Sequence, residues 1–398
     1  MIRNLTTLLC FFAALSGYAQ NIKTGVVVVG STPSAMSAAI QAARSGVKTL
    51  LIDAGRFDVI TLASSDQAIN GGFYQEFKKH ADSLQKSPVT AKTFSPEFTA
   101  QVFKKWTDTV KNLTVLPNAS IRKIEKSKKG WEIDLKDREI KAEVIVDATQ
   151  TQSVIPIALA KLDKEDKVSL INPASSYLYR TSVAFGAGAN FEPVPIFKLI
   201  NTGADNLITT FPGGETNFLT GQAAGATAAY CVFFNTNTNN LSVRKIQTEL
   251  LSYKSQIIRF DDLSDTDSAK VALQHIGVTG ILPARSQNGR LLFLPQAPVS
   301  TDEIKPALKQ YYSRSHVWFL DHKEDKLKLE TALDLIKFLA SRGEELNREV
   351  EKAWKTSLKL TGSYDLKKEL TRRELAILLD TYLQPYSVEV DLQGNVRR

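Results

Sequence analysis

The sequence is poor in the residues that build disulfide frameworks and zinc sites. It has 2 cysteines, Cys10 and Cys231, and 4 histidines in 398 residues. Two cysteines this far apart exclude a small disulfide scaffold. No metal-ligand spacing relates the histidines to Cys, Asp or Glu, so we do not predict a zinc site. These histidines are His80, His275, His316 and His322.

Several other signatures are also missing from the chain. It has no run of five or six like charges, no internal repeat, no Gly-x-Ser-x-Gly elbow and no Walker loop. The net charge of +8 (50 basic against 42 acidic residues) is spread along the chain, so nucleic acid is not predicted as a partner. With 43% hydrophobic and 23% charged residues, the composition is that of a folded globular protein. The length predicts two or three structural units, or one large α/β domain with an appendage.

The N-terminal apolar run is too short to span a bilayer, which takes about 20 residues. Arg3, the apolar stretch Leu5–Leu15 and the small residues Gly17 and Ala19 instead form the pattern of a signal peptide over 1–19. We predict cleavage before Gln20 and export to the periplasm or the outside, with no transmembrane segment afterwards. The alternative is a buried N-terminal helix. After cleavage Cys231 stands alone in an apolar helix, where we predict an inert buried thiol.

What the chain does contain is a strong βαβ pattern directly after this segment. Residues 25–30 form a continuous apolar run typical of a buried parallel strand. Pro33 begins an Ala-rich helix that ends before Gly46, and 47–53 reads as a second buried strand. The unit of about thirty residues has the expected size.

The turn of this unit resembles a dinucleotide-binding motif. In such a turn, glycines allow the chain to bend and phosphate to approach, and the helix N-terminus stabilises the phosphate. Here Gly30 holds the first position, Thr32 the second and Ala35 the third. Asp53 ends the second strand, where an acidic residue accepts ribose hydroxyls. The alternative is a βαβ unit of another doubly wound fold.

Further elements are predicted along the remaining chain. We expect helices over 72–85, 96–112 and 218–234, and strands over 113–116, 120–126, 131–135, 139–141, 143–148 and 205–210. The polar stretch 235–240 is the predicted boundary to a mainly helical C-terminal region, in which Thr371 and Glu374 form a capping box. The predicted units are a signal peptide (1–19), an FAD/dinucleotide-binding-type domain (20–235) and the helical region (236–398). The fold class is α/β, Rossmann-like, with a small antiparallel β insertion.

The segment VVVVGSTPSAMSAAIQAARSGVKTLLIDAGRF resembles the FAD-dependent oxidoreductase family common among exported bacterial proteins. Thr-Pro within the phosphate turn is usual in that family. Three later segments resemble it in the same order, so that the likeness covers about 24–235. They are Asn70–Phe77, Ala142–Thr149 and the pair Asp205–Leu207 with Gly221–Gly225.

The resemblance implies an exported FAD-dependent oxidoreductase with a small-molecule or glycan substrate. FAD would carry the hydride chemistry, while the protein supplies position, dipoles and exclusion of water. The residues implied at the cofactor are Gly30, Ser31, Thr32, Ser34, Ala35, Asp53, Arg56, Thr149, Gly221 and Gln222. No residue is predicted as catalytic, and no oligomeric state is predicted.

The chain departs from the family on the side of the flavin ring. Gln150 replaces a glycine, 58–66 replaces a glycine-rich loop, and 209–217 is shorter than the usual loop. These departures favour the alternative hypothesis, a non-catalytic member that keeps the fold as a binding or structural protein. Small residues in the helix after Gly221 also predict close packing on the sheet, with or without a flavin contact.

Overall fold

The structure is a computed structural model of the 398-residue chain. It describes residues 21–53, 60–61 (backbone only), 71–88, 93–160, 175–186, 192–210, 217–264 and 266–397. The predicted signal peptide therefore lies outside the described residues. Within them, no helix is both long enough and apolar enough to cross a bilayer.

A parallel sheet forms the centre of the N-terminal region. Strand β1 (Ile22–Val29) pairs in parallel with β2 (Thr49–Ile52) on one side and β8 (Glu139–Asp147) on the other. Beyond them, β5 (Leu113–Leu116) pairs with β2 and β11 (Leu207–Thr209) with β8, again in parallel. The order β5-β2-β1-β8-β11 is that of a Rossmann-type doubly wound sheet. The predicted fold class is confirmed.

An antiparallel hairpin extends this sheet at the amino half of β8. Strands β6 (Ile121–Ser127) and β7 (Gly130–Leu135) form the hairpin, and β7 pairs with β8. The sequence predicted two short strands where β8 is one strand. The reason is that Ala142, at the predicted break, pairs with both Thr24 and Trp131 and so keeps the backbone extended.

The two faces of the sheet build two separate cores. Alternate β1 residues point to opposite faces, as in any strand, with Val26 and Val28 in one core and Val27 in the other. The larger core lies under helices α2 (Pro33–Arg44) and α7 (Phe218–Phe233), which run side by side over one face. The smaller core lies under the other face.

The smaller core joins the hairpin to a short helix. Trp131 and Ile133 of β7 pack there with Val154 of α6 (Val154–Leu159). The loop between β8 and α6 begins at the end of a sheet strand and ends at a helix that packs on the sheet. It is therefore attached to the sheet at both of its ends.

Helices α2 and α7 approach each other backbone to backbone at two glycines. A Cβ on Gly221 would lie 2.2 Å from the Ser34 carbonyl oxygen, and one on Gly225 equally close to that of Ala38. Later residues of α7 thus meet later residues of α2, so the helices are parallel and both begin at the carboxyl ends of the strands. The predicted close packing of the small-residue helix is confirmed.

Two more helices close this region. Helix α4 (Gly72–Gln85) spans the predicted residues, and α5 (Pro96–Thr107) begins at Pro96 behind its N-cap Ser95. Their aromatic side chains pack together, with the ring centroids of Phe73 and Trp106 5.6 Å apart. A two-residue pairing of β3 (Ile60–Thr61) with β4 (Thr93–Phe94) lies beside them.

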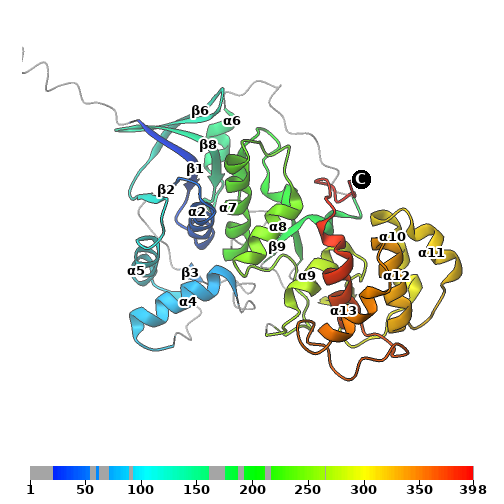
Figure 1. Ribbon diagram of the computed structural model, residues 1–398. Coiled ribbons are helices and arrows are strands. Elements are labelled where there is room, and N and C mark those ends of the chain that lie inside the picture. The colour runs from blue at the N-terminus through cyan, green and yellow to red at the C-terminus, as the bar shows by residue number, and fades with distance from the viewer. Residues whose placement is uncertain are drawn as a thin grey trace, which may run out of the picture.

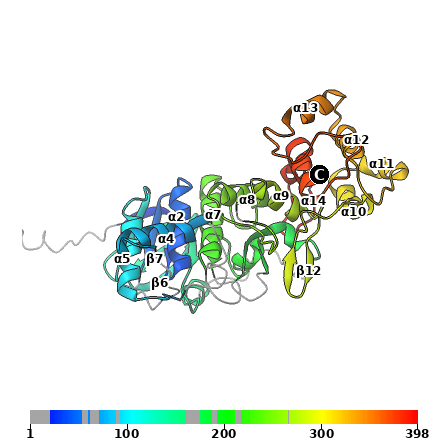
Figure 2. The ribbon, with the colours of Figure 1, turned by 90° about the horizontal axis from the view of Figure 1, so that it is seen from below.

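The C-terminal region is mainly helical, as predicted, and extends away from the sheet (Figures 1 and 2). Its helices are α8 (Val243–Ser252), α9 (Lys270–Thr279), α10 (Thr301–Tyr311), α11 (Ser315–Asp321), α12 (Leu329–Ala340), α13 (Glu345–Ala353) and α14 (Arg372–Leu378). A π-helical turn η4 (Leu379–Leu383) and the 3-10 turn η5 (Pro385–Ser387) follow, and β12 (Arg285–Gln287) pairs with β13 (Arg290–Leu292) in a projecting hairpin. The capping box of Thr371 and Glu374 is present at α14.

Part of the chain before the predicted boundary packs on this helical region. The short elements η2 (Leu178–Thr181), β9 (Ser182–Phe185), β10 (Pro193–Pro195) and η3 (Ile196–Leu199) precede β11 in the chain. Within them, Arg180 donates to the carbonyls of Thr279 and Gly394, and Ser182 donates to that of Ile257. A division at residue 235 therefore separates segments that are in contact.

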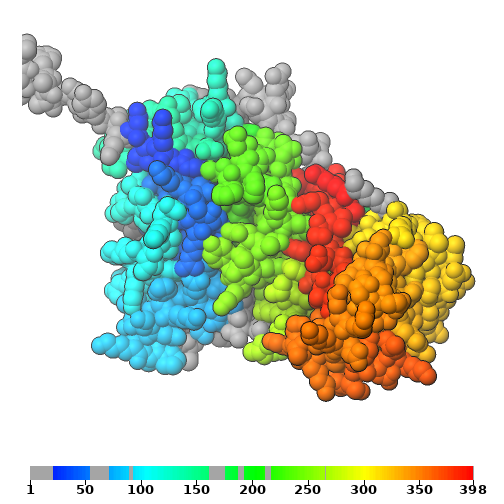
Figure 3. Space-filling view, in the orientation of Figure 1, coloured from blue at the N-terminus to red at the C-terminus, as the bar shows by residue number. Residues whose placement is uncertain are grey.

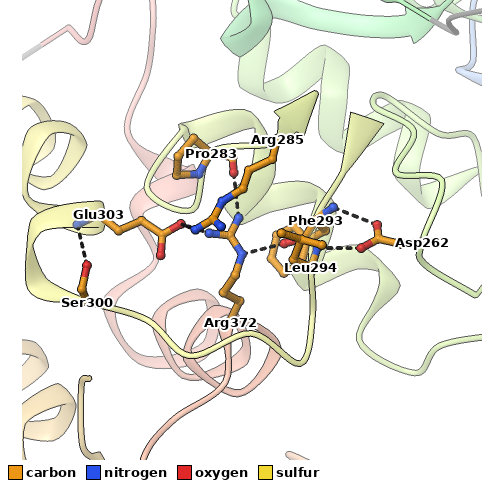
Figure 4. A network of polar contacts seen from close by, with 8 residues as sticks. All are labelled: Asp262, Pro283, Arg285, Phe293, Leu294, Ser300, Glu303 and Arg372. Carbon is orange, nitrogen blue, oxygen red and sulfur yellow. Dashed lines mark hydrogen bonds and ion pairs between the residues drawn. The ribbon is translucent and has the colours of Figure 1, made fainter. Parts of the chain in front are cut away.

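A buried arginine connects α14 to three other segments (Figure 4). Arg372, which is fully buried, donates to the carbonyls of Phe293 (2.6 Å) and Pro283 (2.7 Å) and forms an ion pair with Glu303. The exposed Arg285 contacts the same carboxylate at 3.2 Å. Arg372 therefore fixes α14, α10 and the β12–β13 hairpin relative to one another.

Candidate functional site

The candidate site is the crevice at the carboxyl ends of β1, β8 and β11. The strand order reverses here, because the chain continues from β1 to β2 on one side while β8 lies on the other side of β1. Doubly wound folds bind ligands at such a reversal. Gly30 follows β1 with φ +144°, and its Cβ would lie 2.4 Å from the Ala148 carbonyl oxygen. Only glycine allows the strand ends to approach this closely. The close contact between the two strand ends is thus enough to explain why residue 30 is glycine.

The N-terminus of α2 opens into this crevice. Thr32 is the N-cap, and its hydroxyl accepts from the Ala35 amide (3.1 Å) and donates to the Ala148 carbonyl (3.0 Å). The Ser34 hydroxyl lies 2.9 Å from that of Thr32 and 3.0 Å from that of Thr210, at the end of β11. Pro33 has no amide hydrogen. The helix dipole therefore favours an anionic group, although Thr32 already occupies the Ala35 donor.

Asp53 lies at the neighbouring strand end, as the motif requires. It follows β2 directly, is 6% exposed and accepts a hydrogen bond from the Ser31 hydroxyl. Gly30, Ser31, Thr32, Ser34, Ala35 and Asp53 are thus brought together in one crevice. This is the adenosine side of the predicted site.

The loop after β8 is organised by a residue that the sequence reasoning missed. Asp147 is fully buried and accepts four hydrogen bonds, two from Thr149 (amide 3.1 Å, hydroxyl 2.6 Å) and two from the amides of Val154 and Ile155 (3.0 Å each). It thereby ties the predicted site residue Thr149 to the start of α6. The sequence feature that could have revealed its role is an acidic residue at the end of an otherwise apolar buried strand.

Gln150 does not fill the crevice, because its side chain is exposed in the turn after β8. Gln152, with φ +51°, instead reaches across the strand ends, and its side-chain amide lies 3.4 Å from the Thr209 hydroxyl. The departure at position 150 thus lies on the surface of the turn, and Gln152 is the side chain that spans the strand ends.

The structure gives the two predicted site residues of α7 packing roles. Gly221 contacts Ser34 and Ser37 of α2. Gln222 is fully buried and donates to the Gln41 side chain at 3.0 Å, about 13 Å along α2 from Thr32 at 1.5 Å per residue. The Gln222 amide thus points along the helix pair rather than into the crevice. A cofactor contact by either residue stays a prediction.

Some of the other sequence predictions concern described residues, and some lie outside them. Arg56, the altered loop and most of 209–217 lie outside the described residues. Cys231 is buried, as predicted, and burial raises the pKa of its thiol to about 12. In the described part of the chain, no three His, Cys, Asp or Glu side chains form a group that could hold a metal ion.

The donor set of the crevice matches the chemistry of an adenosine diphosphate group. The Ser31 and Thr32 hydroxyls already donate to Asp53 and to the Ala148 carbonyl, so the N-terminus of α2 is what can stabilise a phosphate, and the Asp53 carboxylate can accept from ribose hydroxyls. The residues present thus fit the adenosine half of a dinucleotide.

Comparison with known proteins agrees with the N-terminal part of this description. Residues 25–167, a little over a third of the chain, match the model of the family described as FAD dependent oxidoreductase. No curated protein sequence matches this chain.

Parts of solved flavoproteins and reductases are similar to part of this chain. The bacillithiol disulfide reductase of Staphylococcus aureus is 16% identical, with 32% of this chain and 38% of that chain covered and a TM-score of 0.24. The thioredoxin reductase of T. acidophilum is 20% identical, with 32% of this chain and 35% of that chain covered and a TM-score of 0.22. A flavoprotein/dehydrogenase of Cytophaga hutchinsonii is 16% identical, with 34% of this chain and 41% of that chain covered and a TM-score of 0.26. The likeness spans about two fifths of these proteins or less. At such values it carries no argument about activity, and the fold assignment rests on the strand order.

Proposed function

We propose that this protein is an exported FAD-dependent oxidoreductase. The observation that carries the proposal is the turn from Gly30 to Ala35 at the point where the strand order reverses, with Asp53 at the adjacent strand end. Both lie within the residues that match the family model. The same placement of turn and acidic residue is how Rossmann-type sites hold a dinucleotide.

Each residue of the crevice has a defined part in this proposal. The N-terminus of α2, capped by Thr32, faces the pyrophosphate, and Asp53, oriented by Ser31, holds the ribose. Asp147 keeps the Thr149 loop in place at the entrance to the ring side. FAD, when bound, supplies the acceptor for a hydride.

Flavin content is the first measurement. The purified mature protein is examined by visible absorption, then mixed with excess FAD, desalted and examined again. Flavin bands that survive desalting support the proposal and justify a screen of small-molecule and glycan substrates. A protein that is colourless and does not retain FAD would contradict it and favour the non-catalytic alternative.

Asp53→Ala tests the adenosine side directly. Loss of a charged hydrogen-bond acceptor for ribose costs about 1.5–3 kcal/mol, so the Kd for FAD should rise about 10- to 100-fold. The control is Asp134→Ala, in the β6–β7 hairpin, where the carboxylate pairs with Arg122 near the surface. An unchanged Kd for Asp53→Ala, measured by quenching of FAD fluorescence, would remove Asp53 from the site.

Export is tested separately from cofactor binding. The intact mass of the protein recovered from the periplasm or medium should correspond to a chain beginning at Gln20. A mass that includes residues 1–19 would contradict signal cleavage and leave the flavin proposal untouched.

A further inference from the structure

A cavity of about 560 Å³ lies far from the strand-end crevice. It is lined by the end of α2 at Ser45, the C-terminal half of α7, helix α8 and residues 386–389. Ser45 is separated from Thr32 by the full length of α2, about 20 Å at 1.5 Å per residue. The volume falls within the range of about 300–1,000 Å³ found for small-molecule sites. In Figure 3, the surfaces of α7 and α8 (green) lie against the C-terminal segment (red).

One face of α7 provides the apolar wall of this cavity. Ala226, Ala229, Tyr230 and Phe233 follow the i, i+3, i+4, i+7 spacing that places side chains on one helix face. The two alanines are buried, whereas Phe233 is 68% exposed and the adjacent Phe234 48%. The Phe234 ring contacts those of Tyr230 (4.6 Å between centroids) and Phe233 (5.1 Å). An aromatic surface of this kind is left uncovered beside an empty volume.

The charges around the cavity balance. Glu249 accepts from Ser45 at 2.7 Å and Glu389 from Ser242 at 2.5 Å. Against these two carboxylates stand two cations, Arg244 and Lys245. The second oxygen of each carboxylate takes no hydrogen bond from a described residue, so both remain available as acceptors.

The protein hydrogen-bonds one of the two cations and places the other over an aromatic ring. Arg244 is 3% exposed and donates to the carbonyls of Arg180 and Val388 and to the Gln247 side chain. The Lys245 ammonium lies over the Phe234 ring at 4.7 Å. Since neither sign of charge is in excess, a charged ligand would lose its hydration without a net electrostatic gain.

We propose that this cavity binds an uncharged, mainly apolar small molecule that carries a hydroxyl group. Its apolar body packs on Ala229 and Phe233, and its hydroxyl donates to the carboxylate of Glu249 or Glu389. A few polar groups around an apolar surface are the general composition of small-molecule sites. The proposal is independent of FAD, because none of the lining residues belongs to the strand-end crevice.

Three probes with one carbon skeleton test this proposal on the full chain. They are 4-phenylbutan-1-ol, 4-phenylbutylamine and 4-phenylbutyrate, titrated by calorimetry and by ligand-detected NMR without added FAD. The alcohol should bind saturably at one site, and the amine and the carboxylate at least tenfold more weakly. No saturable binding of the alcohol, or tighter binding of either charged probe, would overturn the proposal.

Variants then locate the bound alcohol. Ala229→Phe fills the cavity and should lower the affinity more than tenfold, and Phe233→Ala should lower it several-fold. Leu320→Ala in α11 is the matched control, because Leu320 is 70% exposed and lies outside the cavity. Because Phe233 is largely exposed, its variant is expected to fold even if Ala229→Phe does not. Unchanged affinity for the alcohol in Phe233→Ala, or in Ala229→Phe if that variant folds, would place the alcohol elsewhere and overturn the proposal.

Discussion

The N-terminal and C-terminal regions are held together by different interactions. In the N-terminal region, α2 and α7 meet backbone to backbone at Gly221 and Gly225, and the strands bury alternate aliphatic side chains in two cores. In the C-terminal region and the η2 segment packed on it, buried arginines join separate segments by donating to carbonyl groups. They are Arg180, Arg244 and Arg372, each at most 3% exposed.

This difference shows two physical ways of fixing how segments pack. The helix pair depends on shape, because any side chain at the contact would collide with the opposing backbone. The arginine networks depend on hydrogen bonds, because a buried guanidinium is tolerated only when its donors are satisfied. The two regions should therefore respond differently to changes of volume and to removal of polar groups.

The largest effect is expected for Gly225→Val. The added side chain would meet the Ala38 backbone at 2.2 Å, which neither helix can relieve without separating from the other. Overpacking of this kind costs about 3 kcal/mol or more, so the variant should be strongly destabilised or insoluble. Urea unfolding measures the effect, with Gly186→Ala as control, since its Cβ would have only an ordinary contact at 3.7 Å. Near-wild-type stability of Gly225→Val would show that the helix contact is adaptable.

Arg372→Met should be the next most damaging change. Removing the buried guanidinium leaves two carbonyls without their donor and Glu303 with only the exposed Arg285 as partner, at a cost of about 3–5 kcal/mol. Arg285→Met removes the exposed partner of the same carboxylate and should cost less than about 1 kcal/mol. Equal losses in the two variants, measured by urea unfolding, would contradict the role given to burial.

Asp147→Asn tests whether the N-terminal region also contains a critical polar group. The NH2 group of an asparagine here would face either the donors of Thr149 or the amides of Val154 and Ile155. In both orientations a donor would meet a donor. We expect a loss of about 1–3 kcal/mol in the free energy of unfolding. The control Asp134→Asn removes a surface pair with Arg122 and should cost less than about 1 kcal/mol. If both variants unfold at the same urea concentration, Asp147 does not organise the loop.

The smallest effect is a pH dependence at His80, which stacks on Trp106 at 5.5 Å. Burial lowers the pKa of His80 below its usual 6.5, so the unfolded chain takes up the proton first as pH falls. Stability from this group is present above pH 6.5 and is lost as pH falls through the lowered pKa in the folded state. His80→Gln should therefore flatten the decline in stability between pH 7 and 5. An unchanged slope would mean that His80 does not contribute to it.

The same contrast explains what could be predicted from the sequence. The buried strand, the Ala-rich helix after Pro33, the capping box at Thr371 and the packing of the helix after Gly221 follow local patterns of apolar, small or capping residues. The arginine networks could not be predicted, because Arg180 and Arg372 bond to carbonyls that are 79 to 214 residues away in the chain. No local pattern marks such partners.

The candidate site was predicted in part for the same reason. Gly30, Thr32 and Asp53 lie within one βαβ unit, and the structure brings them together as the motif requires. The role of Asp147 depends on a loop that returns to it, and that of Gln222 on the pairing of two distant helices. Both needed tertiary contacts that the motif does not contain.

The glycine contacts between α2 and α7 also have a mechanical consequence. Long side chains at a helix contact can change rotamer and absorb small displacements, whereas backbone against backbone at Gly221 and Gly225 leaves no such slack. The two helices should therefore move together as one rigid body. Since α7 is 16 residues long, about 24 Å at 1.5 Å per residue, its Phe233 end and the Ser34 end of the pair are linked across that span. A displacement at either end would then be transmitted along the whole pair.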